Sequence, residues 1–412
     1  MPLLIPTDEL RPGMQLVEPL VSGGQVWMQN GRPLTETDVE NLRRRFPDLA
    51  VRVADPLLDN AVKFEDDSRE REVAVLAQRR VSECMSQVGQ RFSNRTSPQE
   101  VDFNAIQAAL RELMVHLEKN PVTAALVVRC MDSSGYLGLH TGNVFYLSML
   151  LGAAALHLVI AERKKVAWAR DVRSTFTQDL TPLGLGVLLM DFGLIPHQHL
   201  LLKKEPLTPP ERQVLLDHPQ AGAEMLPSNI NAVSRMIVRT HHENYAGSGY
   251  PKKLPREKLD IFSRIVRIAD AYDAATSDGV FSEARSPARV LWEMTCGPYR
   301  RFFDPELMAI FARLIQPFPI GAKLRLSDGR YAAVVKYNRK HSFDPTVVIA
   351  FDANNQPLPR EQLEGPFQLS ERPELRIASL LGEDLSFIYS AQDQPIPPAG
   401  SDFTSAYQAS FP

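Results

Sequence analysis

The feature that most constrains the fold is a change of hydrophobic period near Ile320. Between about residues 120 and 315 the apolar residues recur at helical spacing, without sustained alternation. From Ile320 the pattern has period two. Leu324-x-Leu326, a Ser-Asp-Gly turn and Tyr331 to Val335 are typical of a hairpin, and Thr346 to Phe351 of a further strand. The pattern predicts a helical domain followed by a smaller β-rich module.

The first 57 residues have the pattern of a small α+β module. Glycine and proline break short apolar runs, Thr35 with Asp38 resembles a helix capping box, and Val51-Arg52-Val53 resembles a short strand. Two helices are expected at about 68–91 and 102–119. Either they form a linker that pairs in a homodimer, or they are the first helices of the main domain.

At 412 residues the chain is too long for one ordinary domain. We predict a mainly α fold, in which a helical domain is flanked by a small N-terminal α+β module and a small C-terminal β-rich module. The expected segments are the N-terminal module at 1–57, a helical linker at 58–119, the helical domain at 120–315, the β-rich module at 316–390, and a disordered tail at 391–412, which is rich in proline and serine.

Composition excludes several classes of protein. A net charge of -3 argues against a nucleic-acid polymer as partner, because such readers usually carry a basic face. The three scattered cysteines fit a reducing cytoplasm rather than a disulfide framework. The start of the chain does not resemble a secretory signal, and the most apolar stretch, Phe145 to Ile160, is too short to span a bilayer. We expect that stretch to be a buried helix and the protein to be cytoplasmic.

The strongest chemical signal is His241-His242-Glu243 followed by Gly247-x-Gly249-Tyr250-Pro251. Neighbouring residues on a regular helix do not share a face, so two adjacent histidines reach one site only near a helix end. The glycine-rich run supplies such an end. Taken alone, the pair has a less favoured alternative interpretation, a solvated helix end beside an incidental turn.

Other histidines and aspartates strengthen the case for a metal site. Asp191 follows an apolar run, Asp270 and Asp273 follow another, and His140 and His218 lie in helical segments. A carboxylate buried in an apolar helix needs a cation or a hydrogen-bond partner. Imidazole with carboxylate suits iron, manganese or similar divalent ions, and two ions bridged by an aspartate can clamp a phosphodiester.

In their order and context these residues resemble the HD-GYP family, a helical subgroup of the HD phosphohydrolase superfamily. The resemblance covers roughly residues 120 to 300, and it rests on Tyr136-x-x-x-His140, Asp191, His218, His241-His242-Glu243, Gly249-Tyr250-Pro251 and Asp270-x-x-Asp273. Family members typically bind two or three metals, often iron or manganese, and hydrolyse cyclic di-GMP to a linear dinucleotide or to GMP. The resemblance therefore implies a divalent metal cofactor, one or two ions here, and cyclic di-GMP or a related cyclic dinucleotide as ligand.

The resemblance also implies a role for each matching residue. His140, Asp191 and Asp270 match ligands of one metal, and Asp191 would bridge to a second held by His218, His241 and His242, which makes Asp191 and Asp270 the catalytic candidates. Glu243 and Asp273 match positions around the site. Gly249, Tyr250 and Pro251 match the loop that lines the ligand pocket, and Arg264 matches a structural or phosphate-side cation.

This sequence departs from the family pattern on the catalytic surface. The adjacent His-Asp pair of the family is Met190-Asp191 here, and a thioether is a poor ligand for iron or manganese. The lysine that follows the pair is missing, and the usual Ser-Asp-Arg-Pro-Tyr run reads Ser-Asp-Gly-Val-Phe at 277–281. The common aspartate before the glycine-rich loop is Ala246. Lost cations would otherwise neutralise phosphate oxygens.

These departures favour a degenerate HD-GYP protein with weak or absent hydrolysis, which acts through ligand binding or through other signalling proteins. Two alternatives stay open: an active phosphodiesterase with a reduced metal set, and a scaffold that binds neither metal nor nucleotide. His197 and His199, just after the altered pair, could fold back as substitute ligands, although such residues are more often exposed in turns.

Overall fold

The structure is a computed structural model that describes residues 3–22, 25–47, 49–56, 62–65, 135–165, 178–203, 205–277, 284–338 and 340–389. They fall into two compact units. We call the first, within 1–69, 286–289 and 315–393, the terminal unit, and the second, within 70–285 and 290–314, the helical unit. The helices expected at 68–91 and 102–119 and the expected disordered tail lie outside the described residues.

The described residues of the terminal unit form three antiparallel sheets, one complete α-helix and several short 3₁₀ segments. Its strands are β1 (Leu3–Pro6), β2 (Gln15–Leu16), β3 (Leu20–Ser22), β4 (Gln25–Met28), β5 (Ala50–Ala54), β6 (Lys323–Leu326), β7 (Tyr331–Lys336), β8 (Thr346–Phe351), β9 (Glu364–Gln368), β10 (Ile377–Leu380) and β11 (Glu383–Asp384). The sheet orders are β1-β5-β2, β3-β4 and β11-β10-β6-β7-β8-β9. The predicted hairpin is confirmed, because β6 and β7 pair antiparallel.

The helix of the terminal unit, α1 (Glu36–Arg45), begins where the sequence predicted. The Thr35 side chain accepts a hydrogen bond from the Asp38 backbone, and Asp38 in turn accepts one from the backbone of Thr35, which completes the capping box. Val39 and Leu42 on its inner face are buried.

The N-terminal segment and the β-rich segment share one hydrophobic core in this unit. Val53 from the N-terminal segment and Val335 and Phe351 from the β-rich segment belong to the same buried cluster. The two flanking modules are thus present but associated, and the mainly α fold with flanking modules is confirmed. The exact boundaries at 57, 119, 315 and 390 stay predictions.

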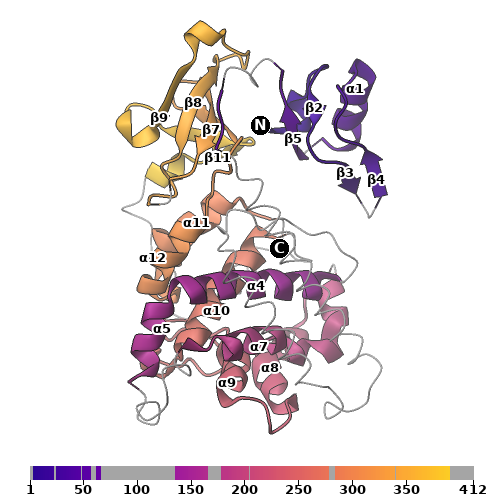
Figure 1. The fold of residues 1–412 in the computed structure, drawn as a ribbon. Coiled ribbons are helices and arrows are strands. Elements are labelled where there is room, and N and C mark those ends of the chain that lie inside the picture. Colours follow the sequence, from indigo (N-terminus) through magenta and orange to yellow (C-terminus); the bar gives the residue numbers. More distant parts are fainter. Residues whose placement is uncertain are drawn as a thin grey trace. The chain divides into compact units, whose positions relative to one another are not determined.

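The helical unit is a bundle (Figure 1). Its helices are α4 (Gly135–Ala154), α5 (Leu156–Arg163), α7 (Thr181–Leu189), α8 (Pro209–Met225), α9 (Ala232–Thr240), α10 (Ile261–Thr276), most of α11 (Pro287–Thr295) and α12 (Pro305–Leu314), with the 3₁₀ segments η5 (Phe192–Leu202) and η7 (Arg300–Phe302). Helix α4 packs on α7 and α10, α7 packs on α9, and α8 packs on α9 and η5.

The stretch predicted as one buried helix, Phe145 to Ile160, is two helices. α4 ends at Ala154, and Ala155 has φ −93° and ψ 14°, outside the helical range, so the chain bends by 75° before α5. Ala155 is fully buried at the bend. Among the described residues no single helix has the length and apolar character needed to cross a membrane; the bent α4–α5 pair meets that test when its helices are counted together.

Candidate metal centre

Two glycines bring the end of α7 against its neighbours. A Cβ on Gly186 would lie 2.6 Å from the side chain of Ile237 in α9, and a Cβ on Gly193 would lie 2.2 Å from the carbonyl oxygen of His218 in α8. Larger residues at these positions would push the elements apart. Because Asp191 lies between the two glycines, this close packing carries its carboxylate toward the histidines of α8 and the end of α9.

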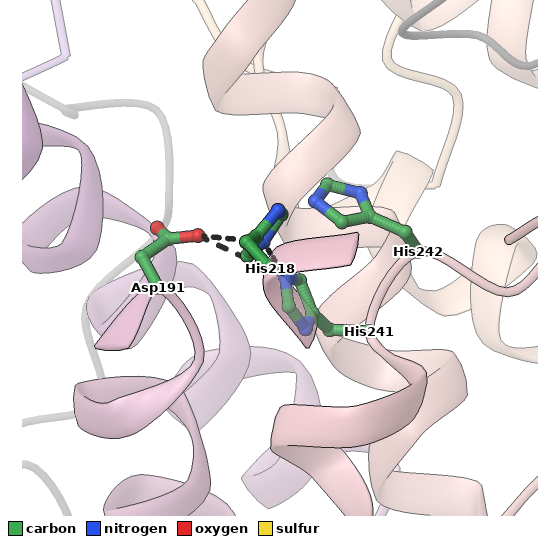
Figure 2. A group of neighbouring side chains, drawn as sticks. All are labelled: Asp191, His218, His241 and His242. Carbon is green, nitrogen blue, oxygen red and sulfur yellow. Dashed lines mark hydrogen bonds and ion pairs between the residues drawn. The ribbon is translucent and has the colours of Figure 1, made fainter. Parts of the chain in front are cut away.

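One buried cluster contains Asp191, His218, His241 and His242 (Figure 2). Each residue offers one ligand atom, and these four atoms lie within 4.8 Å of one another. Asp191 Oδ1 is 3.4 Å from His218 Nε2 and 3.8 Å from His241 Nε2. Helix α9 ends at Thr240, so the double histidine occupies a helix end, as the sequence predicted. The ring centroids of His241 and His242 are 4.2 Å apart.

Backbone carbonyls determine which nitrogen of each ring faces the cluster. His218 Nδ1 lies 2.5 Å from the carbonyl oxygen of Leu215, and His241 Nδ1 lies 2.9 Å from that of Val238. A carbonyl can only accept, so we assign a proton to each Nδ1, which leaves each neutral ring with a lone pair on Nε2. These two Nε2 atoms are 3.2 Å apart. With no proton between them, the contact is repulsive unless a cation shares both lone pairs.

A second group of side chains adjoins the cluster through His140. Its Nε2 is 3.1 Å from Asp270 Oδ1 and 3.9 Å from Asp191 Oδ2, and its Nδ1 is 2.7 Å from Asp273 Oδ2. Asn143 donates to the other oxygen of Asp273 at 2.8 Å. Asp273 therefore orients the ring of His140, as a carboxylate behind a metal-bound histidine often does. The six residues predicted as metal ligands are thus close together, and their roles as ligands stay predictions.

The Gly-Tyr-Pro loop is held against the double histidine by Glu243. Its two carboxylate oxygens accept the backbone N–H groups of Lys252 at 2.7 Å and Leu254 at 2.9 Å. A Cβ on Gly249 would lie 2.3–2.5 Å from backbone atoms of residues 242–244, so only glycine fits there. Tyr250 stacks on His242, with ring centroids 4.6 Å apart. The loop that the resemblance assigned to ligand binding therefore also orients one candidate metal ligand.

Burial favours the neutral forms of His241 and His242 in the absence of metal. Desolvation, followed by the charge of His218, lowers the pKa of His241 to about 4, and desolvation also lowers the pKa of His242 well below its usual value. Burial works to raise the pKa of Asp191, but contact with His218 and the charges of the neighbouring histidines outweigh it and hold the pKa at about 2. Neutral rings at His241 and His242 beside an ionised Asp191 are the protonation states that metal binding requires.

Two orphaned atoms give an independent test of the fit to a metal. Asp191 Oδ2 is buried without a hydrogen-bond partner among the described residues, and so is His242 Nδ1, which approaches Asp270 Oδ2 at 3.3 Å without hydrogen-bond geometry. Leaving such groups unpaired is costly, and a bound cation would satisfy both. The donor set is three imidazoles and a carboxylate, which fits a divalent transition metal. The cluster can therefore hold a metal ion.

Two cationic side chains that the sequence suggested for the site form ion pairs with carboxylates of the protein. The guanidinium of Arg264, predicted as a structural or phosphate-side cation, pairs with the carboxylates of Glu162 and Asp304. These ion pairs give it a structural role, and ligand binding by it stays a prediction. Lys203 pairs with Glu211 at 2.7 Å.

The substitute ligands considered for the altered pair are not in the cluster. Met190 is fully buried. His197 is half-buried and His199 is exposed in η5, with their rings 6.4 Å apart from each other, and neither belongs to the four-residue group.

Arg267 is a site residue that the sequence analysis missed. It is 1% exposed, its Nε donates to Asn244 at 2.9 Å, and its Nη1 lies 3.5 Å from Asp270 Oδ2. Its position three residues before Asp270 on the same helix was the available signal, since residues so spaced share a face. This arginine links the residue after Glu243 to the carboxylate near His140.

Comparison with known proteins identifies an HD domain in this chain. Residues 163–307 match the model of the HD domain. A cyclic di-GMP phosphodiesterase of Pseudomonas aeruginosa is 32% identical over 186 residues, which is 44% of this chain and 44% of the relative. A cyclic di-GMP phosphodiesterase response regulator of Xanthomonas campestris pv. campestris is 41% identical over 144 residues, 33% of this chain and 34% of the relative. The chain thus matches less than half the length of these curated relatives.

A solved structure, an HDG"Y"P protein from Bdellovibrio bacteriovorus, aligns with 76% of this chain and 98% of its own length at 16% identity and a TM-score of 0.42. The HD domain match, the curated relatives and the motif residues gathered around the histidine cluster lead to one conclusion. Residues 163–307 of the chain form an HD domain of the HD-GYP type.

Proposed function

We propose that this chain is a degenerate HD-GYP protein of bacterial cyclic di-GMP signalling, with weak or absent phosphodiester hydrolysis, that acts by binding a cyclic dinucleotide or a signalling protein. The observation that carries the proposal is the asymmetry of the candidate centre. Asp191, His218, His241 and His242 converge with a complete donor set. The adjoining metal position lacks the histidine that precedes the aspartate in the family pattern, because the residue before Asp191 is the buried Met190.

The proposal places one divalent ion, iron or manganese, at Asp191, His218, His241 and His242. When bound, such an ion supplies Lewis-acid polarisation of a phosphoryl oxygen. The chain's own residues hold the ligand atoms in place: the carbonyls of Leu215 and Val238 set the ring orientation of two histidines, and Tyr250 stacks on the third. These contacts support metal binding even if hydrolysis is lost.

Weak hydrolysis follows from missing charge. Phosphodiester hydrolysis builds negative charge on phosphate oxygens, and catalysis depends on cations aimed at them. Among the residues that the structure describes, Lys203 and Arg264 already pair with carboxylates. The family's arginine position after Asp273 is Gly279 here. A chain with the scaffold intact and these cations absent would still bind a cyclic dinucleotide but turn it over slowly.

A second candidate is an active phosphodiesterase with a reduced metal set, and one observation favours it. His140 Nε2 lies within 3.1 Å of Asp270 and 3.9 Å of the orphaned oxygen of Asp191. These three residues could hold a second ion without the missing histidine. The relatives are named cyclic di-GMP phosphodiesterases, which makes cyclic di-GMP the substrate to test.

Metal content separates the candidates first. The protein is expressed without any chelating step, and iron and manganese are measured per chain in the wild type, in Asp191→Ala, and in His157→Ala as a control on an exposed histidine of α5. The proposal expects about one ion in the wild type and control, and none in Asp191→Ala. Two ions would favour the active enzyme, and none would leave only a scaffold.

Turnover is the second test. Cyclic di-GMP is incubated anaerobically with the same three proteins and added Mn(II) or Fe(II), and linear product is followed by chromatography. The proposal expects little or no product from any of them. Hydrolysis by wild type and His157→Ala that disappears in Asp191→Ala would overturn it in favour of the active phosphodiesterase.

Restoration tests the reason for the loss. The double change Met190→His and Gly279→Arg returns both missing groups to their positions in the family pattern. We expect this variant to gain a second ion and measurable turnover. Activity that stays at baseline although a second ion binds would show that the missing ligand is not the only defect.

A further inference from the structure

A cavity of about 610 Å³ lies in the helical unit, apart from the metal-ligand candidates. Tyr245 and Ala246, just after the double histidine, form one side, and residues of α11, η7 and α12 form the other. None of the six candidate metal ligands lines it. Its volume lies within the range of roughly 300–1,000 Å³ that small-molecule sites occupy.

The walls of the cavity are apolar and fixed. Phe303 and Met308 are buried beneath it at 2% and 4% exposure, and Tyr245 contributes an aromatic ring. The Tyr245 N–H donates to the carbonyl of Phe302 at 2.8 Å, which joins the two sides although they are far apart in sequence. The apolar surface is therefore held open by the fold, ready for a flat apolar group.

Three arginines line the cavity, namely Arg256, Arg300 and Arg301. No acidic residue lines it among the residues that the structure describes. Arg256 pairs with exposed Glu257, and Arg300 donates to a carbonyl at 3.3 Å. Arg301 has no hydrogen-bond or ion-pair partner among the described residues, so its guanidinium is available to a ligand. Guanidinium groups bind phosphate and carboxylate alike with two parallel hydrogen bonds. A phosphate monoester carries more negative charge than a carboxylate, so a cavity lined by three arginines and no described acidic residue favours the phosphate.

We propose that this cavity binds a mononucleotide-like ligand, a flat apolar body that carries a phosphate. The body contacts Tyr245, Phe303 and Met308, and the phosphate contacts Arg301 with Arg300 beside it. The site does not require the metal cluster, so it stands or falls separately from the function proposed above.

Calorimetric titration of the purified full-length protein with AMP tests the proposal. We expect AMP to bind, and adenosine and inorganic phosphate each to bind more weakly because each lacks one half of the ligand. Arg301→Ala should weaken AMP binding by roughly tenfold or more, as expected for the loss of a charge-assisted hydrogen bond. Arg212→Ala, an exposed arginine of α8 outside the cavity, should leave it unchanged.

Two further variants keep the result interpretable. Ala309→Phe fills the cavity from an exposed position of α12, so it should block AMP without unfolding the protein, which thermal unfolding verifies. Asp191→Ala removes a metal-cluster ligand and should leave AMP binding unchanged. The proposal is overturned if the wild type binds no AMP, or if Arg301→Ala or Ala309→Phe binds AMP as tightly as the wild type. Loss of AMP binding in Asp191→Ala would also overturn it. Decanoate represents the alternative ligand class, an alkyl carboxylate, and tighter binding of decanoate than of AMP would overturn the proposal as well.

Discussion

Burial of His241 predicts a specific acid sensitivity of the metal-free protein. The ring is fully buried, and desolvation, followed by the charge of His218, lowers its pKa to about 4 from the usual 6.5. As the pH falls below 6.5, the unfolded chain takes up a proton on this residue while the folded chain resists until about pH 4. The free energy of unfolding should therefore fall across this window, by about 3 kcal/mol at pH 4 from His241 alone.

Urea unfolding of the chelator-treated protein at pH 7 and pH 4 measures this loss. Other groups also titrate, so the informative quantity is the difference between wild type and His241→Gln, which cannot take up the proton. We expect the variant to lose about 3 kcal/mol less than the wild type. The control His157→Gln alters an exposed histidine and should behave as the wild type does. Equal losses in wild type and His241→Gln would refute the argument that this imidazole is buried neutral.

Three further predictions follow from the packing and the site. Gly249→Ala forces a Cβ into the backbone of residues 242–244; we expect a loss of roughly 1–3 kcal/mol in urea unfolding and a lower metal content, and a stable, metal-replete variant would contradict the observed approach. Thr35→Ala removes the cap of α1 and should cost about 1 kcal/mol of unfolding free energy, with no change in metal content. Asp273→Asn removes the carboxylate behind His140. In a metal titration the affinity for an ion bound by His140 would fall by roughly 10–100-fold, whereas the single ion that we propose should be retained. Loss of that ion would count against a one-ion centre.

Local patterns were sufficient for the elements that depend on neighbouring residues. The capping box of α1 lies where Thr35 and Asp38 predicted it, because both partners of its hydrogen bonds are within one turn. The β6–β7 hairpin follows from a turn between two alternating runs. The break at Ala155 was missed, since an alanine within an apolar run carries no local signal for ending a helix.

Sequence motifs also indicated which side chains belong to the candidate centre, but not how they are held. The double histidine at a helix end could be inferred because helix geometry prevents adjacent residues from sharing a face. The hydrogen bond from Arg267 to Asn244 could not, because these residues are 23 positions apart in the chain. The carbonyls that orient His218 and His241 lie three residues earlier in the chain, but the sequence does not show which ring nitrogen faces them.

By itself, the sequence determined the helical class of the central domain, the β-rich pattern after Ile320, and the set of imidazoles and carboxylates suited to a divalent ion. Only the tertiary structure decided that the N-terminal segment and the β-rich segment share a core, that Glu243 holds the Gly-Tyr-Pro loop, and that the Nε2 atoms of His218 and His241 lie 3.2 Å apart. The physical reason is that periodicity and residue chemistry are local properties, whereas close approach of helices at Gly186 and Gly193 depends on the packing of the whole bundle.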